Sequence, residues 1–226
     1  VMHIGTRNTN AEYTMDGAVL ATTVKEKDLG IIITPDLKPA EQVSKAASSA
    51  NSILGRIKRT FTYMDPEMFL PLYKTLVRPH LEYAIQAWCP YYQKDISKLA
   101  KVQRRATKLI PSLAELPYTD RLDKLNLTTL ERQRIRGDMI EVFKILNGHD
   151  IVRAEGFLEL ETGQHTDRTR GHSLKLRKPR HRTYKRNMFF SSRVVDRWNR
   201  LPENIVRSGN VNTFKNRLDQ HWKYAQ

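Results

Sequence analysis

The sequence predicts a mainly α-helical protein that begins with a short β-hairpin region. Apolar residues recur at helical spacing over 43–61 and 99–110, which is typical of helices with one buried face. The first 34 residues instead carry a hairpin turn signal and a β-branched run, which indicate strands. Apolar and aromatic residues four positions apart in the C-terminal tail predict two further short helices.

The strand signals lie in residues 1–36. Asp16 and Gly17 interrupt the stretch Tyr13–Leu20, and these two residue types together favour a tight hairpin turn. A second stretch, Lys27–Thr34, is rich in isoleucine and ends before a proline, as strands often do. We therefore expect short strands and hairpin turns before residue 37.

Residues 37–150 are predicted to form a helical bundle. The buried stripe of its first helix is expected to be Val43, Ala46, Ala47, Ala50, Ile53, Leu54, Ile57 and Phe61. Asp65 followed by Pro66 marks the start of a second helix, because an acidic cap accepts from free N–H groups and proline fits the first turn. Pro79 lacks an N–H, so it should kink or restart that helix.

A further helix of this bundle has an apolar face beside a basic one, and Asp95 is its expected N-cap. At about 100° per residue, the apolar face consists of Leu99, Val102, Ala106, Leu109 and Ile110. The basic face consists of Lys98, Lys101, Arg105 and Lys108. A charged helix face is often just solvent-facing, so a binding role for these cations is left open by the pattern alone.

The last helix of the bundle has sequence signals at both ends. Thr128 and Glu131 form a capping-box pair, and Gly148 suits a left-handed C-cap. Residues 149–167 are polar and mixed, so they are the best candidate for a linker.

The last predicted segment is residues 151–226, which include most of this linker. It has its own small predicted core. Its two apolar stripes are Phe190, Val194 and Trp198, and Phe214, Leu218 and Trp222. Asn212 is the expected cap of the second helix. Because apolar stripes bury themselves, we expect the two tryptophans in a core rather than stacked on bases.

Positive charge is concentrated in this tail. The whole chain has 39 Lys/Arg and 24 Asp/Glu, whereas residues 165–226 have 16 Lys/Arg and 4 Asp/Glu. Nine cations and no acid lie between positions 168 and 186: Arg168, Arg170, Lys175, Arg177, Lys178, Arg180, Arg182, Lys185 and Arg186. Concentrated charge of one sign attracts a polyanion, and nucleic acid is the commonest polyanion in a cell.

This basic run has a plain interpretation and a functional one. Such a run can be a solvated tail or a nuclear import signal. Leu174, Leu176 and Tyr184 interleave with the cations, which favours binding to a nucleic-acid backbone through phosphate contacts. Tyr184, which charged residues flank, is a better candidate for stacking on a base than Trp198 or Trp222. If about six cations engage single-stranded phosphates, log affinity should fall against log salt with a slope of about −4.

The sequence offers no constellation that indicates a metal site or a nucleophile. Cys89 is the single cysteine, so a disulfide framework is excluded. His165, His172 and His181 lack the paired ligand spacing of a zinc site, and we expect them on a polar surface. No apolar run is long enough to span a membrane and no signal peptide is visible. We expect a nuclear or cytoplasmic ribonucleoprotein location, without secretion or membrane association.

Two long segments resemble one known family. Residues 72–110 read LYKTLVRPHLEYAIQAWCPYYQKDISKLAKVQRRATKLI, and residues 188–206 read MFFSSRVVDRWNRLPENIV, followed by VNTFKNRLDQHW at 211–222. These segments are similar to the thumb and the extreme C-terminus of non-LTR retrotransposon reverse transcriptases of the jockey-like lineage. The segment KDLGIII at 27–33 resembles the primer-grip hairpin between palm and thumb in that family.

The resemblance implies a division of the chain and a role for each part. Residues 1–36 would be the end of a palm, with Leu29 and Gly30 near the primer end. Residues 37–150 would be a thumb, whose basic face would contact a hybrid duplex. Residues 151–226 would be a basic nucleic-acid-binding segment. The expected partners are RNA template, DNA, and the palm and fingers of the parent polymerase.

One feature of the family is absent. Its polymerases hold two metal ions on paired carboxylates in an Asp-Asp turn, and this chain has no Asp-Asp pair. We therefore expect a non-catalytic C-terminal portion of an RNA-directed DNA polymerase that grips RNA template and cDNA or target DNA. Mg²⁺ is expected only in the palm, which would precede Val1. Two alternatives stay open: a free-standing nucleic-acid-binding or assembly protein derived from such an element, and a non-functional relic.

Overall fold

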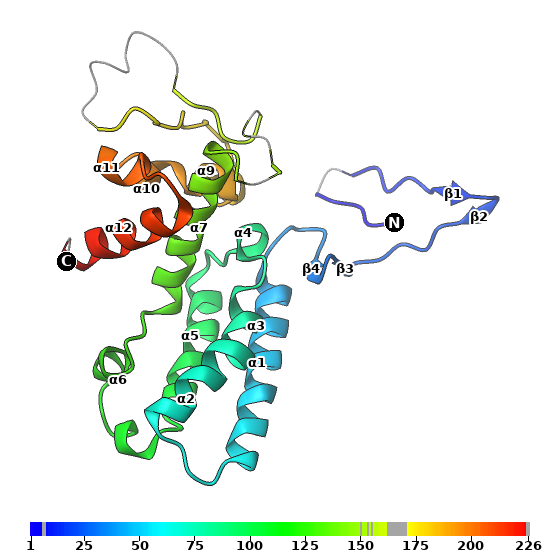
Figure 1. Ribbon diagram of the computed structural model, residues 1–226. Coiled ribbons are helices and arrows are strands. Elements are labelled where there is room, and N and C mark those ends of the chain that lie inside the picture. The colour runs from blue at the N-terminus through cyan, green and yellow to red at the C-terminus, as the bar shows by residue number, and fades with distance from the viewer. Residues whose placement is uncertain (6–7, 150, 153, 155, 162–170, 225–226) are drawn as a thin grey trace. The chain divides into compact units, whose positions relative to one another are not determined.

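The computed structural model describes residues 1–5, 8–149, 151–152, 154, 156–161 and 171–224. It is mainly helical, at 54 % helix, with two small two-stranded antiparallel sheets near the N-terminus (Figure 1). The predicted fold class is thereby confirmed. The chain divides into two compact units, Val1–Glu131 and Arg132–Gln226.

Both sheets of the first unit are hairpins closed by two residues with positive φ. The strands are β1 (Thr14–Met15), β2 (Ala18–Val19), β3 (Glu26–Asp28) and β4 (Ile31–Ile33). Asp16 at φ 50° and Gly17 at φ 77° close the first hairpin, as the sequence predicts. Leu29 at φ 44° and Gly30 at φ 88° close the second, so the stretch 27–34 forms two paired strands around a turn.

The helices of the first unit enclose one apolar core. They are α1 (Ala40–Thr60), α2 (Pro66–Leu72), a π-helical turn η1 (Tyr73–Val77), α3 (Arg78–Glu82), α4 (Ile85–Trp88), α5 (Gln93–Thr107), a 3₁₀ turn η2 (Pro111–Leu113) and α6 (Tyr118–Lys124). The predicted stripe of α1 is buried except for Ile53 and Phe61, which are partly buried and pack against the same core. Asp65 caps α2 as predicted, because its Oδ1 accepts from the Met68 N–H at 2.8 Å.

The chain stays helical across Pro79 instead of breaking there. The π-helical turn η1 immediately precedes α3, in which Pro79 occupies the first turn. The N–H of Arg78 bonds to the carbonyl of Tyr73, five residues back. A wider turn of this kind accommodates an irregularity in the backbone hydrogen bonds of a helix. Val77 before Pro79 and Leu81 after it are both buried in the same core.

The expected cap of α5 is wrong. The helix begins at Gln93, with Tyr92 at the N-cap position, and Asp95 lies inside the first turn, where it is 5 % exposed. A carboxylate in the first turn interacts favourably with the helix dipole, which explains an acid there without a capping role. The predicted apolar face is correct, since Leu99, Val102 and Ala106 are fully buried.

The second unit contains α7 (Leu130–Leu146), which straddles the division between the units, and the C-terminal helices. These are α8 (Tyr184–Asn187), α9 (Phe190–Arg193), α10 (Val195–Trp198), α11 (Glu203–Val206) and α12 (Val211–Tyr224). Phe143 of α7 stacks on Phe214 of α12 with ring centroids 4.4 Å apart. The contacts thus place most of α7 with the tail, whereas the sequence suggested a bundle extending to residue 150.

The cap of α12 is also shifted by two residues from the expected position. The Thr213 N–H donates to Oδ1 of Asn210 at 2.8 Å, so Asn210 caps the helix and Asn212 lies in its first turn. The buried face of α12 is as predicted, with Phe214 and Leu218 fully buried.

Candidate nucleic-acid interface

The basic run predicted from sequence is folded onto the second unit over residues 171–186, which we call the basic segment. It holds seven Lys/Arg and no Asp or Glu. Arg168 and Arg170, the first two cations of the run, lie outside the described residues. The basic segment is therefore largely an ordered part of the protein surface and not merely a solvated tail.

The first half of the basic segment runs antiparallel to residues 159–161 around one isolated β-bridge. Leu176 forms an antiparallel bridge with Leu160. The Arg177 N–H donates to the Glu159 carbonyl and the Glu161 N–H donates to the Lys175 carbonyl, both at 2.8 Å. Successive side chains of a strand point to opposite sides, so alternate residues of this stretch face the core and the solvent.

The inward-facing residues are fastened to the end of α10. The Trp198 indole N–H donates to the Leu174 carbonyl at 2.7 Å. The Asn199 amide receives the Leu176 N–H and donates to the Leu176 carbonyl, both at 2.8 Å. The Asn199 side chain thus takes the place of a neighbouring strand. It satisfies both backbone polar groups of Leu176.

His172 is part of this anchor, and its expected place on a polar surface is wrong. The residue is 3 % exposed. Its Nδ1 accepts from the Leu174 N–H at 3.1 Å, so the ring proton is on Nε2 and points to the Trp198 carbonyl at 2.9 Å. Burial lowers the pKa of His172 and outweighs the Trp198 carbonyl and the Glu203 carboxylate, which favour protonation.

Acidification is expected to weaken the second unit through His172. The lowered pKa means that the folded state binds fewer protons than the unfolded chain, whose histidine titrates at about 6.5. The contribution of His172 to stability is therefore complete above about pH 6.5 and is lost as the pH falls from there toward the folded-state pKa. Urea unfolding at about pH 7.5 and about pH 5.5 should show a lower midpoint at the acid pH.

The control separates His172 from other groups that titrate in this range. His172→Asn keeps an oxygen acceptor near the Nδ1 position and cannot titrate, so its midpoint should depend less on pH than that of the wild type. His181→Gln leaves the hydrogen bonds of His172 in place, so it should keep the wild-type dependence. An equal pH dependence in the wild type and His172→Asn would contradict the assignment.

Arg177 and Lys178 of the basic segment are exposed, whereas Lys175 is half-buried. Arg177 pairs with Glu159 at 3.4 Å, and Lys178 pairs with Asp196 at 2.5 Å. These four side chains are 55–73 % exposed, and pairs so exposed contribute only about 0–1 kcal/mol. A phosphate can therefore replace either carboxylate at little cost. Asp196 therefore serves as a salt-bridge partner of the basic segment.

Two arginines of the basic segment differ from Arg177 and Lys178. Arg180 and Arg182 form no ion pair with any residue that the structure describes, and both are exposed. Lys185 and Arg186 are also exposed and are carried by the single turn of α8. The guanidinium of Arg186 lies over the Phe189 ring, 4.9 Å from its centroid. Within the described part of the basic segment, Arg180 and Arg182 are therefore exposed cations that no described acid neutralises.

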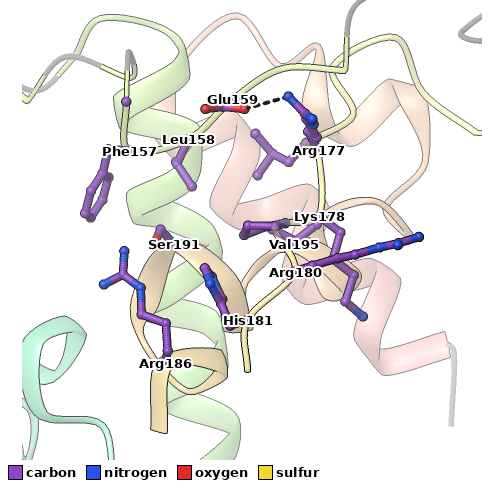
Figure 2. Close-up of a pocket in the computed structure, with 13 residues that line it drawn as sticks. Phe157, Leu158, Glu159, Arg177, Lys178, Arg180, His181, Arg186, Ser191 and Val195 are labelled. Carbon is purple, nitrogen blue, oxygen red and sulfur yellow. Dashed lines mark hydrogen bonds and ion pairs between the residues drawn. The ribbon is translucent and has the colours of Figure 1, made fainter. Parts of the chain in front are cut away.

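The basic segment forms one side of a pocket of about 760 Å³. Its polar lining is Glu159, Arg177, Lys178, Arg180, His181, Arg186 and Ser191. Its apolar lining is Gly156, Phe157, Leu158, Leu176, Pro179 and Val195. Figure 2 shows Phe157 and Arg186 on one side of the pocket and the end of Arg180 on the other. The pocket thus combines several cations and one acid with an apolar wall.

The second predicted group of cations lies on α5, in the first unit. Lys98 donates to the Ser44 hydroxyl at 2.8 Å and Arg105 donates to the Asn51 amide oxygen at 2.6 Å. Both bonds join residues 54 apart, so α1 and α5 run in parallel. Lys101 and Lys108, the other two cations of this face, are exposed. The four residues share one helix face as predicted, but two of them also tie the helices together.

The expected primer-grip residues form the tip of the second hairpin. Leu29 is 84 % exposed, and its carbonyl accepts from the Tyr83 hydroxyl at 3.1 Å. A Cβ added to Gly30 would approach Cε1 of Tyr83 to 3.2 Å. Leu29 has the strained left-handed conformation that Leu37 also has, so this strain does not by itself indicate a binding site.

The aromatic residues divide as expected between core and surface. Trp198 is fully buried and Trp222 packs partly buried against the same core. Tyr184 is 58 % exposed at the start of α8. Of these three rings, therefore, Tyr184 is the one exposed enough to meet a base.

Sequence reasoning missed Phe157, and it missed the anchoring by Asn199. Phe157 lies within the stretch 149–167, where the polar composition indicated a linker, although Leu158 beside it is 4 % exposed. The anchoring of the basic segment did have a signal in the sequence. His172, Leu174 and Leu176 alternate with polar residues, and such alternation is typical of a half-buried extended stretch.

Comparisons of the chain with protein-family models, with curated proteins and with solved structures found no match. Within the described ranges, no three His, Cys, Asp or Glu side chains gather in a way that could hold a metal ion. Among the helices in those ranges, none is both long and apolar enough to cross a bilayer.

Proposed function

We propose that this chain is a non-catalytic, nucleic-acid-gripping C-terminal portion of an RNA-directed DNA polymerase of a mobile element. In this role the second unit holds RNA template or target DNA through its basic segment. The first unit contributes the basic face of α5 and the exposed tip of the Leu29–Gly30 turn. The family assignment rests on the sequence resemblance, whereas the binding role rests on the geometry of the cations.

The observation that carries the binding role is the exposed positive charge of the basic segment, in which Arg180 and Arg182 pair with no described acid. Anchoring by Trp198, Asn199 and His172 fixes the backbone, so the outward cations are held in place before a ligand arrives. Pre-organised cations lose less conformational entropy on binding than those of a disordered tail. Several exposed cations close together in the sequence suit the repeating phosphates of a polynucleotide.

The proposal predicts salt-dependent binding to an RNA–DNA hybrid. The purified chain should bind a fluorescent hybrid, with log affinity falling linearly against log salt. Arg180→Gln combined with Arg182→Gln should weaken binding and reduce the slope by about 1.5 to 2, because each lost phosphate contact removes about 0.9. Fluorescence anisotropy over a salt series measures both quantities. We chose these two arginines because neither pairs with a described acid.

Two companion variants make this result specific. Lysines at both positions should restore most of the slope, since lysine also neutralises phosphate. Lys124→Gln combined with Lys223→Gln removes two exposed charges outside every candidate surface and should leave the slope nearly unchanged. Absence of hybrid binding even at low salt would refute the proposed function. If both double glutamine variants lost the same amount of affinity and slope, the net charge of the chain alone would explain binding.

A further inference from the structure

The pocket beside the basic segment has properties that phosphate binding alone does not require. Surface cations suffice to neutralise phosphates, yet this pocket has a wall of buried side chains. Leu158, Leu176 and Val195 are each at most 4 % exposed, and all three line the pocket. A site that joins an apolar wall to cations suits a ligand with both a flat apolar part and negative charge.

Phe157 is the aromatic residue of the apolar wall. Its ring stacks on the buried Phe190, with centroids 5.8 Å apart and planes 18° apart. It is nonetheless 42 % exposed and lines the pocket. A ring braced from behind and exposed in front can stack on a nucleobase, and such stacking is tolerant of base identity.

The cations stand where the phosphates beside such a base could lie. Arg186 is on the same side of the pocket as Phe157, and the end of Arg180 is on the opposite side (Figure 2). Lys178 and His181 also line the pocket. Positive charge on both sides of the pocket matches a base with a phosphate on each side, as in the middle of a strand.

The size of the pocket favours one nucleotide of a single strand. A volume of about 760 Å³ is typical of pockets that take ligands of nucleotide size. A base inside a duplex is paired and stacked, and taking it out has an energetic cost. An unpaired strand has much less to lose, so the pocket should select single-stranded over duplex nucleic acid.

We propose that this pocket holds one unstacked nucleotide of single-stranded nucleic acid, with the base on Phe157 and the flanking phosphates at Arg180 and Arg186. This inference rests on the proposed function, because it specifies which form of nucleic acid the basic segment takes. It goes beyond that function in separating a base-binding pocket from the general phosphate-binding surface.

The test compares strands with and without bases. Anisotropy titrations use fluorescent oligothymidylate of about ten nucleotides and an abasic strand of the same length. Phe157→Leu keeps an apolar contact for Phe190 but removes the ring, so it should weaken oligothymidylate binding by about tenfold. Its affinity for the abasic strand and for the RNA–DNA hybrid should stay within about a factor of two of the wild type. Phe157→Tyr should keep the wild-type preference for bases.

A matched control excludes a general effect on folding. Leu160 is also 42 % exposed and forms the isolated bridge to the basic segment, but it does not line the pocket. Leu160→Ala should leave oligothymidylate binding unchanged. Circular dichroism melting curves of all variants check that the helices persist. A loss of oligothymidylate affinity as large in Leu160→Ala as in Phe157→Leu would overturn the inference.

The possible failures are distinguishable. Equal affinity of the wild type for the abasic strand and oligothymidylate would overturn the pocket assignment and leave the proposed grip on phosphates standing. Binding of oligothymidylate without binding of the hybrid would support the pocket and count against a grip on a hybrid duplex. Free thymidine monophosphate competing as well as the oligonucleotide would show a mononucleotide site. Polyglutamate competing equally well would indicate an acidic-peptide site, and either result overturns the inference.

Discussion

Asp138→Ala is expected to lower the free energy of unfolding of the second unit by about 3–5 kcal/mol. Asp138 lies on α7, and its carboxylate receives two hydrogen bonds from Arg193 on α9, at 3.0 Å and 2.9 Å. The two side chains are only 5 % and 9 % exposed. Burial raises the pKa of Asp138, and the guanidinium of Arg193 opposes that change. Removing the carboxylate would leave a buried guanidinium without its counter-ion.

The measurement must report on the second unit alone. Amide hydrogen exchange resolved to peptides of α12 does so, because exchange from a buried helix follows opening of the core around it. A loss of 3–5 kcal/mol corresponds to exchange faster by about two to three and a half orders of magnitude. Peptides of α1, which belongs to the first unit, should show little change.

A second ion pair of the same unit is the control. Arg136 and Asp219 also form a two-bond contact, at 2.7 Å and 2.8 Å, but their side chains are 27 % and 49 % exposed. Asp219→Ala should therefore cost no more than about 1 kcal/mol. The double variant Asp138→Leu, Arg193→Met should recover much of the lost stability, since both charges are gone. If Asp138→Ala costs no more than Asp219→Ala, burial does not decide the importance of the pair.

The helices themselves were predictable because local rules specify them. The stripe of α1, the Asp65 cap and the apolar face of α5 each follow from neighbours within a few turns. What those patterns do not contain is the partner of each apolar face. The periodicity of α7 predicts burial of Met139 and Phe143 but is silent on which core receives them, and they pack with the tail.

Of the candidate site, only the positive charge could be predicted from the sequence. Clustered cations identify an anionic partner from sequence alone, and they are visible in any reading of 168–186. The anchoring of the basic segment depends on contacts across long sequence separations, such as that between Leu176 and Asn199, 23 residues apart. Phe157 becomes a pocket wall only because Phe190 supports it from behind. Contacts of this kind arise from tertiary packing, which composition and periodicity do not encode.

Trp198→Ala is the other change expected to have a large effect, lowering the stability of the second unit by about 3–5 kcal/mol. Trp198 is fully buried, its ring meets Phe214 at a centroid distance of 6.0 Å, and the ring of His172 stands edge-on to it at 5.8 Å. Truncation would leave a large cavity and also free the Leu174 carbonyl from the indole N–H. Hydrogen exchange in α12 again measures the loss.

Two further variants distinguish a core tryptophan from a base-stacking one. Trp198→Phe keeps most of the ring volume but leaves the buried Leu174 carbonyl without its donor, so it should cost about 1–3 kcal/mol. Tyr184→Ala removes an exposed ring and should change stability by less than about 0.5 kcal/mol. A stacking role for Trp198 would show the reverse pattern, with lost nucleic-acid affinity and intact stability. Because Trp198 holds the basic segment in place, we expect stability and affinity to fall together in Trp198→Ala.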